Sequence, residues 1–129
     1  MNWPLVLKLS LFGLAMAVAT VFVIPSSLEP VFWLVIFMIC AVVIARQAEG
    51  RNFVHGLLVG IVNSVWVTGA HVLLFDTYVA NHQAEAQAMS TMPLPPRVMM
   101  AVIGPVIGVV SGVVIGILAV IAAKILRRA

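Results

Sequence analysis

Charged residues are scarce in this chain, and their scarcity defines its class. Only 9% of the 129 residues are Asp, Glu, Lys or Arg, whereas 64% are hydrophobic and the mean hydropathy is +1.21. A globular domain of this length cannot hide so much apolar surface from water, because small domains leave much of their surface exposed. The sequence therefore predicts an integral membrane protein whose solvent is a lipid bilayer.

Cysteine is almost absent as well. The single cysteine, Cys40, lies in an apolar run, which excludes an internal disulfide and a zinc site built from cysteines. We interpret Cys40 as a small buried hydrophobe.

The apolar runs contain no carboxylate. All four acidic residues fall in loops or at the ends of runs: Glu29, Glu49, Asp76 and Glu85. A proton-coupled exporter of the small multidrug type is expected to hold a carboxylate inside the membrane, and none is placed there. The chain also lacks GxSxG, HExxH and a glycine-rich phosphate loop. We therefore predict no catalytic residue, no metal site and no cofactor.

Four apolar runs are candidates for membrane spans. They cover residues 5–24, 31–45, 53–75 and 98–123, and a polar outer loop occupies 76–97. A helix needs roughly 20 residues to cross the hydrocarbon core. The second run, about 15 residues long, would rise only about 23 Å, so snorkelling or local thinning must cover the mismatch. The fold class predicted is all-α, an integral membrane four-helix bundle forming one domain over 1–129.

The basic residues predict the orientation of this bundle. Arg97 alone would lie outside if the N-terminus is cytoplasmic, and six would lie inside: Lys8, Arg46, Arg51, Lys124, Arg127 and Arg128. Positive residues favour the cytoplasmic side, which predicts an N-in/C-in topology. Because these residues sit at span ends, they suit lipid headgroups, and we expect no nucleic acid partner.

The first run has an alternative interpretation as a cleavable signal peptide. Lys8 precedes an apolar stretch that reaches the small-residue tract "AMAVAT", as in secretory signals. The stretch continues through "VFVI" without a polar cleavage region, which favours a retained span. Cleavage would leave three spans with the same orientation.

Small residues mark the faces on which helices meet in lipid, since close backbone approach replaces the hydrophobic drive there. At about 100° per residue, one arc of the run 53–75 contains Gly56, Gly60 and Ser64. In the last run a glycine recurs at every fourth position: Gly104, Gly108, Gly112 and Gly116. We interpret the two arcs as a packing seam between these helices rather than as a pore wall.

The first run carries a weaker small-residue stripe, and the second carries none. We therefore expect spans one, three and four to pack closely. The second span should lie at the periphery and present bulk to lipid or to another subunit, through Phe32, Trp33, Phe37 and Met38.

Asn63 and His71 form the candidate polar site, because they share the small-residue face of the run 53–75. A histidine there could relay protons, bind a metal or hydrogen-bond a ligand. The alternative, which we favour, is a histidine that bonds across helices or reaches headgroup water. His55 and His71 lie about 160° apart around the helix and cannot share one metal.

The segments "EGRNFVHGLLVGIVNSVWVTGAHVLLFDTYV" and "GVVSGVVIGILAVIAAKILRR" resemble a family of small four-span bacterial inner-membrane proteins of unknown function. The resemblance covers residues 49–128. It implies a four-helix membrane fold in the bacterial inner membrane and supplies no catalytic residues.

Three functional hypotheses remain open. The leading one is a non-enzymatic membrane protein that acts through helix–helix packing, or through association with itself or with a partner membrane protein. The alternative is a small oligomeric channel or transporter. A third is a lipid-site transferase, because "ARQAEGRNFVHG" contains the Arg, Glu and His types that four-span eicosanoid and glutathione transferases use, although its spacing does not reproduce their motif.

Overall fold

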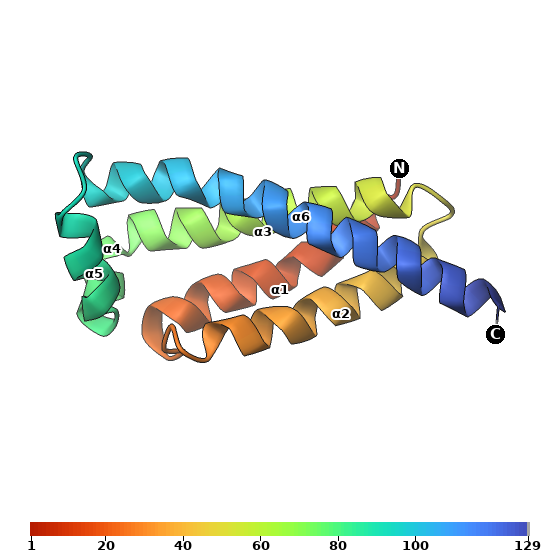
Figure 1. The fold of residues 1–129 in the computed structure, drawn as a ribbon, viewed down its shortest axis with the longest axis horizontal. Coiled ribbons are helices and arrows are strands. Elements are labelled where there is room, and N and C mark those ends of the chain that lie inside the picture. The colour runs from red at the N-terminus through yellow and green to blue at the C-terminus, as the bar shows by residue number, and fades with distance from the viewer. Residues whose placement is uncertain (129) are drawn as a thin grey trace.

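The protein is a bundle of helices. The computed structural model describes residues 1–128, and no strand occurs among them. Figure 1 shows six helices: α1 (Trp3–Phe22), α2 (Glu29–Gln47), α3 (Asn52–Leu73), α4 (Phe75–Asn81), α5 (Gln83–Ser90) and α6 (Pro96–Arg128). Four of them, α1, α2, α3 and α6, are long and apolar enough to cross a membrane. The all-helical fold with four candidate spans agrees with the sequence analysis.

The helix bounds differ from the predicted runs most clearly in α2, in α6 and in the polar segment, and α6 extends from Pro96 to Arg128. Helix α2 has 19 residues and begins at Glu29, so it rises about 28 Å and is longer than the second run suggested. The polar loop predicted for 76–97 is largely helical, because α4 and α5 occupy most of it.

Local chemistry accounts for several helix ends. The side chain of Asn2 accepts a hydrogen bond from the backbone N of Leu5 at 3.1 Å and so caps α1. Pro30 and Pro96 lie in the first turns of α2 and α6, where a missing N–H costs nothing. Between α2 and α3 the chain turns through Gly50 (φ 86°) and Arg51 (φ 51°).

Helix α3 lies at the centre of the bundle. It packs along α6 on one side and along α1 on the other, while α2 packs mainly on α6. The close packing expected of spans one, three and four is thus centred on α3, which contacts both α1 and α6. Helix α2 is less peripheral than predicted, because its side chains Cys40 and Ile44 share a buried core with Ile115 of α6.

Large apolar side chains cover the outside of all four long helices. Examples are Leu11, Leu34, Val65 and Val106, each more than half exposed. Apolar surface this extensive is unusual on a soluble monomer. It fits helices that face lipid.

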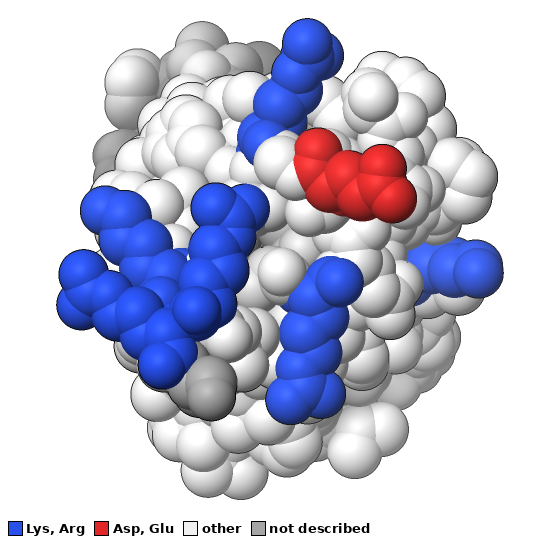
Figure 2. All heavy atoms as spheres, turned by 90° about the vertical axis from the view of Figure 1, so that its right-hand side faces the viewer, with Lys and Arg blue, Asp and Glu red and all other residues white. Residues whose placement is uncertain are grey.

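Charge is divided between the two ends of the bundle. Both termini lie at the same end (Figure 1), and Figure 2 looks onto that end, where Lys and Arg side chains surround a single acidic patch. The basic residues at the helix ends there are Arg46, Arg51, Lys124, Arg127 and Arg128. The opposite end, formed by α4, α5 and the neighbouring helix ends, carries Glu29, Asp76, Glu85 and Arg97.

Candidate functional site

Helices α3 and α6 approach each other so closely that no side chain would fit at the glycine positions on their contact. A Cβ atom on Gly60 would meet the backbone of Gly112, and one on Gly56 would meet the backbone of Gly116. Only glycine allows two helix backbones to come this near.

The contact continues toward the other end of the pair with side chains on α3. A Cβ atom on Gly108 would meet the side chain of Ser64, and one on Gly104 would meet the side chain of Thr68. All seven positions predicted for helix packing therefore lie on the contact between α3 and α6. That contact is formed within one chain.

A cavity of about 820 Å³ opens beside this pair, between α2, α3 and α6. Helices α2 and α6 meet near the end that carries the termini and diverge toward the other end, where α4 and α5 lie across the bundle (Figure 1). The lining is mainly apolar and includes Trp33, Phe37, Val67, Met99, Ile103 and Ile107. Trp33 and Phe37, predicted to face lipid or another subunit, thus face this cavity.

His71 lies in the wall of the cavity and bonds across to α1. Its Nε2 atom is 2.9 Å from Oγ1 of Thr20, and that hydroxyl is 2.7 Å from the carbonyl oxygen of Met16. A hydroxyl has one proton, which Thr20 donates to Met16, so Nε2 of His71 is the donor to Thr20. The Nδ1 atom of His71 has no hydrogen-bond partner among residues 1–128.

Three aromatic rings close the end of the cavity. The ring of Tyr78 lies 4.4 Å from that of His71 and is stacked on that of His82 at 4.2 Å, measured between centroids. His82 donates from Nδ1 to the carbonyl of Tyr78 at 3.0 Å. Asn81 ties α4 to the end of α1 by donating from Nδ2 to the carbonyl of Val21 at 2.8 Å. These bonds hold α4 over the end of the bundle.

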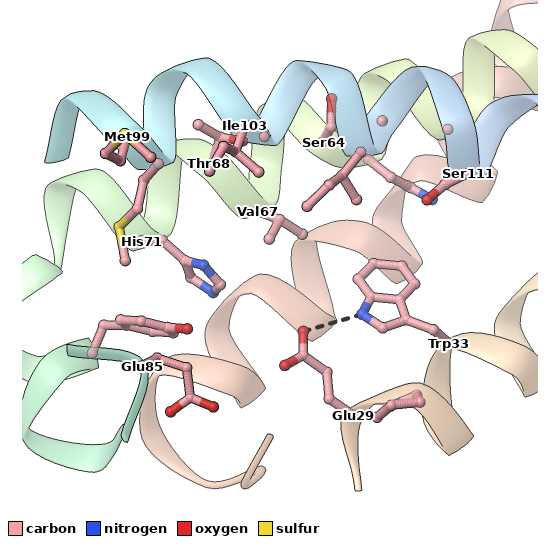
Figure 3. Close-up of a pocket in the computed structure, with 18 of the residues that line it drawn as sticks. Glu29, Trp33, Ser64, Val67, Thr68, His71, Glu85, Met99, Ile103 and Ser111 are labelled. Atoms are coloured by element: carbon pink, nitrogen blue, oxygen red, sulfur yellow. Dashed lines mark hydrogen bonds between the residues drawn. The ribbon is translucent and has the colours of Figure 1, made fainter. Parts of the chain in front are cut away.

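Two carboxylates border the same end of the cavity. Glu29 and Glu85 both line the cavity, and Figure 3 shows their side chains below His71. Glu29 accepts a hydrogen bond from Nε1 of Trp33 at 3.3 Å. Both carboxylates lie in a loop or at a span end in the sequence. Their place in the site could not be predicted, because 56 residues separate them in the chain and neither lies in an apolar run.

The acidic residues at this end affect the pKa values of neighbouring groups. A side-chain hydrogen bond with Ser26 is the main cause that lowers the pKa of Glu85 below its usual value, so this carboxyl is ionised at neutral pH. Burial, followed by the negative charges of Glu29 and Glu85, raises the pKa of Tyr78 to about 12. The end of the cavity is therefore an electronegative environment.

Asn63 lies deeper in the cavity wall and is the least satisfied polar residue there. It is 4% exposed, it lies against Gly13 of α1, and neither Oδ1 nor Nδ2 has a hydrogen-bond partner. Buried side-chain amides nearly always have partners, and leaving one unpaired costs about 1–3 kcal/mol. Asn63 and His71, the predicted polar pair, both line the cavity.

The segment considered for a transferase lies at the opposite end. Glu49, Arg51 and His55 line a separate depression near the N-terminus. Both ring nitrogens of His55 bond to backbone, Nδ1 to the carbonyl of Arg51 at 2.9 Å and Nε2 to the amide of Asn2 at 3.1 Å. The imidazole is thus occupied in holding the chain. Within residues 1–128, no three His, Cys, Asp or Glu side chains gather in a way that could hold a metal ion.

The chain matches no known family model, no curated protein and no solved structure. Its function must therefore be inferred from the packing seam, the cavity and the residues that line the cavity.

Proposed function

We propose that this chain spans a bacterial inner membrane four times, with both termini in the cytoplasm, and binds an amphipathic molecule that is dissolved in the membrane. The binding site is the cavity between α2, α3 and α6. The division of basic residues supports the orientation, since Arg97 is the one Lys or Arg at the end opposite the termini. The resemblance to small inner-membrane proteins supports the location.

The cavity is the observation that carries the binding function. Ligand pockets typically measure about 300–1,000 Å³ and combine an apolar lining with a few polar groups that orient the ligand. This cavity has about 820 Å³, an apolar wall along α2 and α6, and polar groups at one end, among them Glu29 and His71. A molecule with an apolar body and a polar head matches that division.

The glycine seam supports this function indirectly. Because Gly56, Gly60, Gly112 and Gly116 face one another within one chain, these four glycines hold α3 on α6 and are not available to a partner. The packing hypothesis thus describes the scaffold, and the cavity supplies the activity.

The open conduit that a channel needs has less support. Helices α2 and α6 close around Cys40, Ile44 and Ile115, each with no accessible surface, between the cavity and the end that carries the termini. A transporter would have to open this core, which no feature of the described residues indicates.

A photolabelling experiment tests the binding function. The protein is placed in lipid nanodiscs with an uncharged, diazirine-bearing fatty alcohol, and the labelled peptides are mapped by mass spectrometry. We expect labels on the cavity-facing parts of α2 and α6. The Val67→Trp substitution should fill the cavity and reduce this labelling about fivefold or more.

Val65→Trp is the matched control, because Val65 is 63% exposed on the same helix and its replacement should leave the labelling unchanged. Labels spread evenly over the lipid-facing residues, with no effect of Val67→Trp, would refute the binding function.

Accessibility of an introduced thiol tests the orientation. Ser90 on α5 and Arg127 on α6 are both exposed at opposite ends of the bundle, and the native Cys40 is buried. A membrane-impermeant thiol reagent added to the periplasmic side should label Ser90→Cys and spare Arg127→Cys. The reverse pattern would overturn the N-in/C-in topology.

A further inference from the structure

The charged side chains that line the cavity are all of one sign. Glu29 and Glu85 are both lining residues, and no Lys or Arg of residues 1–128 is among them. Figure 3 shows both carboxylates, from α2 and α5, on the side of the cavity below His71. A positive charge at this end of the cavity would be attracted to both carboxylates.

The nearest basic side chain is already engaged. Arg97 is 3.7 Å from Asp76, and its guanidinium lies over the ring of Phe75 at 5.2 Å from the centroid. The other titratable groups at this end are His71, Tyr78 and His82. The hydroxyl of Tyr78 supplies no counter-charge to the carboxylates, because it is neutral when protonated and negative when ionised.

Aromatic rings and an unpaired amide complete the surroundings. Trp33, hydrogen-bonded to Glu29, and Tyr78 both line the cavity, and the faces of such rings attract cations. Farther along the wall, the amide of Asn63 is 96% buried and has neither of its hydrogen-bonding atoms paired. Neither atom is accessible from the cavity, since the side chain lies against Gly13 of α1.

We propose that the cavity takes an amphipathic cation: an ammonium-type head at the end lined by Glu29 and Glu85, with an apolar body along the α2–α6 wall. This inference rests on the proposed binding function and adds the sign of the ligand's charge. An anionic amphipath of the same shape would meet two carboxylates and no basic side chain. It is therefore rejected at the head position, which is where specificity arises.

Competition between two amphipaths of opposite charge tests the inference. Dodecyltrimethylammonium and dodecyl sulfate have the same tail, and each competes with the uncharged diazirine label in nanodiscs. Their membrane concentrations are matched with protein-free discs, because the two partition differently. We expect the ammonium compound to displace the label at about one-tenth of the concentration that the sulfate requires, a tenfold difference in affinity.

Substitution of the two carboxylates tests whether the preference for the ammonium compound arises at this site. Glu29→Gln and Glu85→Gln should each weaken it, and the double variant should reduce it to about twofold or less while the uncharged label still binds. Glu49→Gln is the matched control, because it removes the same charge at the opposite end of the bundle and should leave the preference intact.

The two proposals fail in different ways. Equal displacement by both compounds, with the cavity still labelled in the unaltered protein, would overturn the cationic ligand and leave the binding function standing. A preference that persists in the double variant would also overturn it, since a general surface effect would then be the cause. Absence of cavity labelling would refute the binding function itself.

Discussion

The same three helices pack differently at the two ends of the bundle. Near the termini, α2, α3 and α6 close into a core, whereas toward α4 and α5 they enclose a cavity. Helices α3 and α6 stay together throughout, since the glycine row runs along their contact, so the difference comes from α2. Its closed half presents Cys40 and Ala41, and its open half presents Trp33 and Phe37. Small side chains let helices meet, and large ones hold them apart.

The strongest way to break this comparison is to separate α3 from α6. Gly60→Ala places a methyl group against the backbone of Gly112, and we expect a loss of about 3 kcal/mol in the free energy of unfolding, at the upper end of the cost of overpacking. Denaturation in mixed detergent micelles measures this change.

Gly69→Ala is the control on the same helix, because a Cβ atom there would have nothing within 4 Å. It should be neutral or slightly stabilising, since alanine favours a helix over glycine by about 1 kcal/mol. Equal losses in both variants would mean that the close contact is not what holds the pair together.

Asn63→Leu sharpens the comparison by removing the unpaired amide from the cavity wall. Replacing an unsatisfied buried amide with an apolar group of similar size should raise the free energy of unfolding by about 1 kcal/mol. A residue that served only packing would show this gain alone. If Asn63 binds the ligand, the substitution should also weaken a competitor that carries a hydrogen-bonding group in its apolar body, so that this competitor displaces less of the photolabel. Unchanged displacement would show that Asn63 serves packing alone.

Thr20→Val tests the bond that closes the back of the cavity. It leaves Nε2 of His71 without its partner on α1, and we expect a loss of about 1 kcal/mol. Thermal unfolding of the purified protein measures it. If the variant matches the unaltered protein, the bond contributes nothing to holding α3 on α1.

Asn81→Ala should have the smallest effect, because it removes one bond at the exposed end. The loss of the contact between Nδ2 and the carbonyl of Val21 should cost about 0.5 kcal/mol. Faster amide hydrogen exchange confined to α4 and α5 is the expected sign. Faster exchange throughout the bundle would show that this end is coupled to the core.

The scaffold was predictable from the sequence because its signals are local. Apolar runs marked all four long helices, and the spacing of Gly56, Gly60 and the glycines of α6 indicated which faces meet. The polarity of Asn63 and His71 within an apolar run also singled out two residues of the cavity wall, since polar side chains are costly in such runs.

The rest of the site depends on contacts between distant segments. Glu29 and Glu85 have no local signal that relates them, and they come together only because α4 and α5 fold back over the bundle. Trp33 resembles any lipid-facing aromatic in sequence. Its side chain faces the cavity because α2 diverges from α6, a feature of tertiary packing that periodicity does not encode.

The turn between α2 and α3 couples backbone shape to the placement of charge. Arg51 is the one non-glycine residue of residues 1–128 with a positive φ, at 51°, a conformation that costs an ordinary side chain about 1–2 kcal/mol. Glycine would adopt it freely, yet glycine carries no charge. Arg51→Gly would therefore relax the turn and at the same time remove one of the cations on which the proposed insertion direction depends. Position 51 is thus a point where better local folding and correct topology are in conflict.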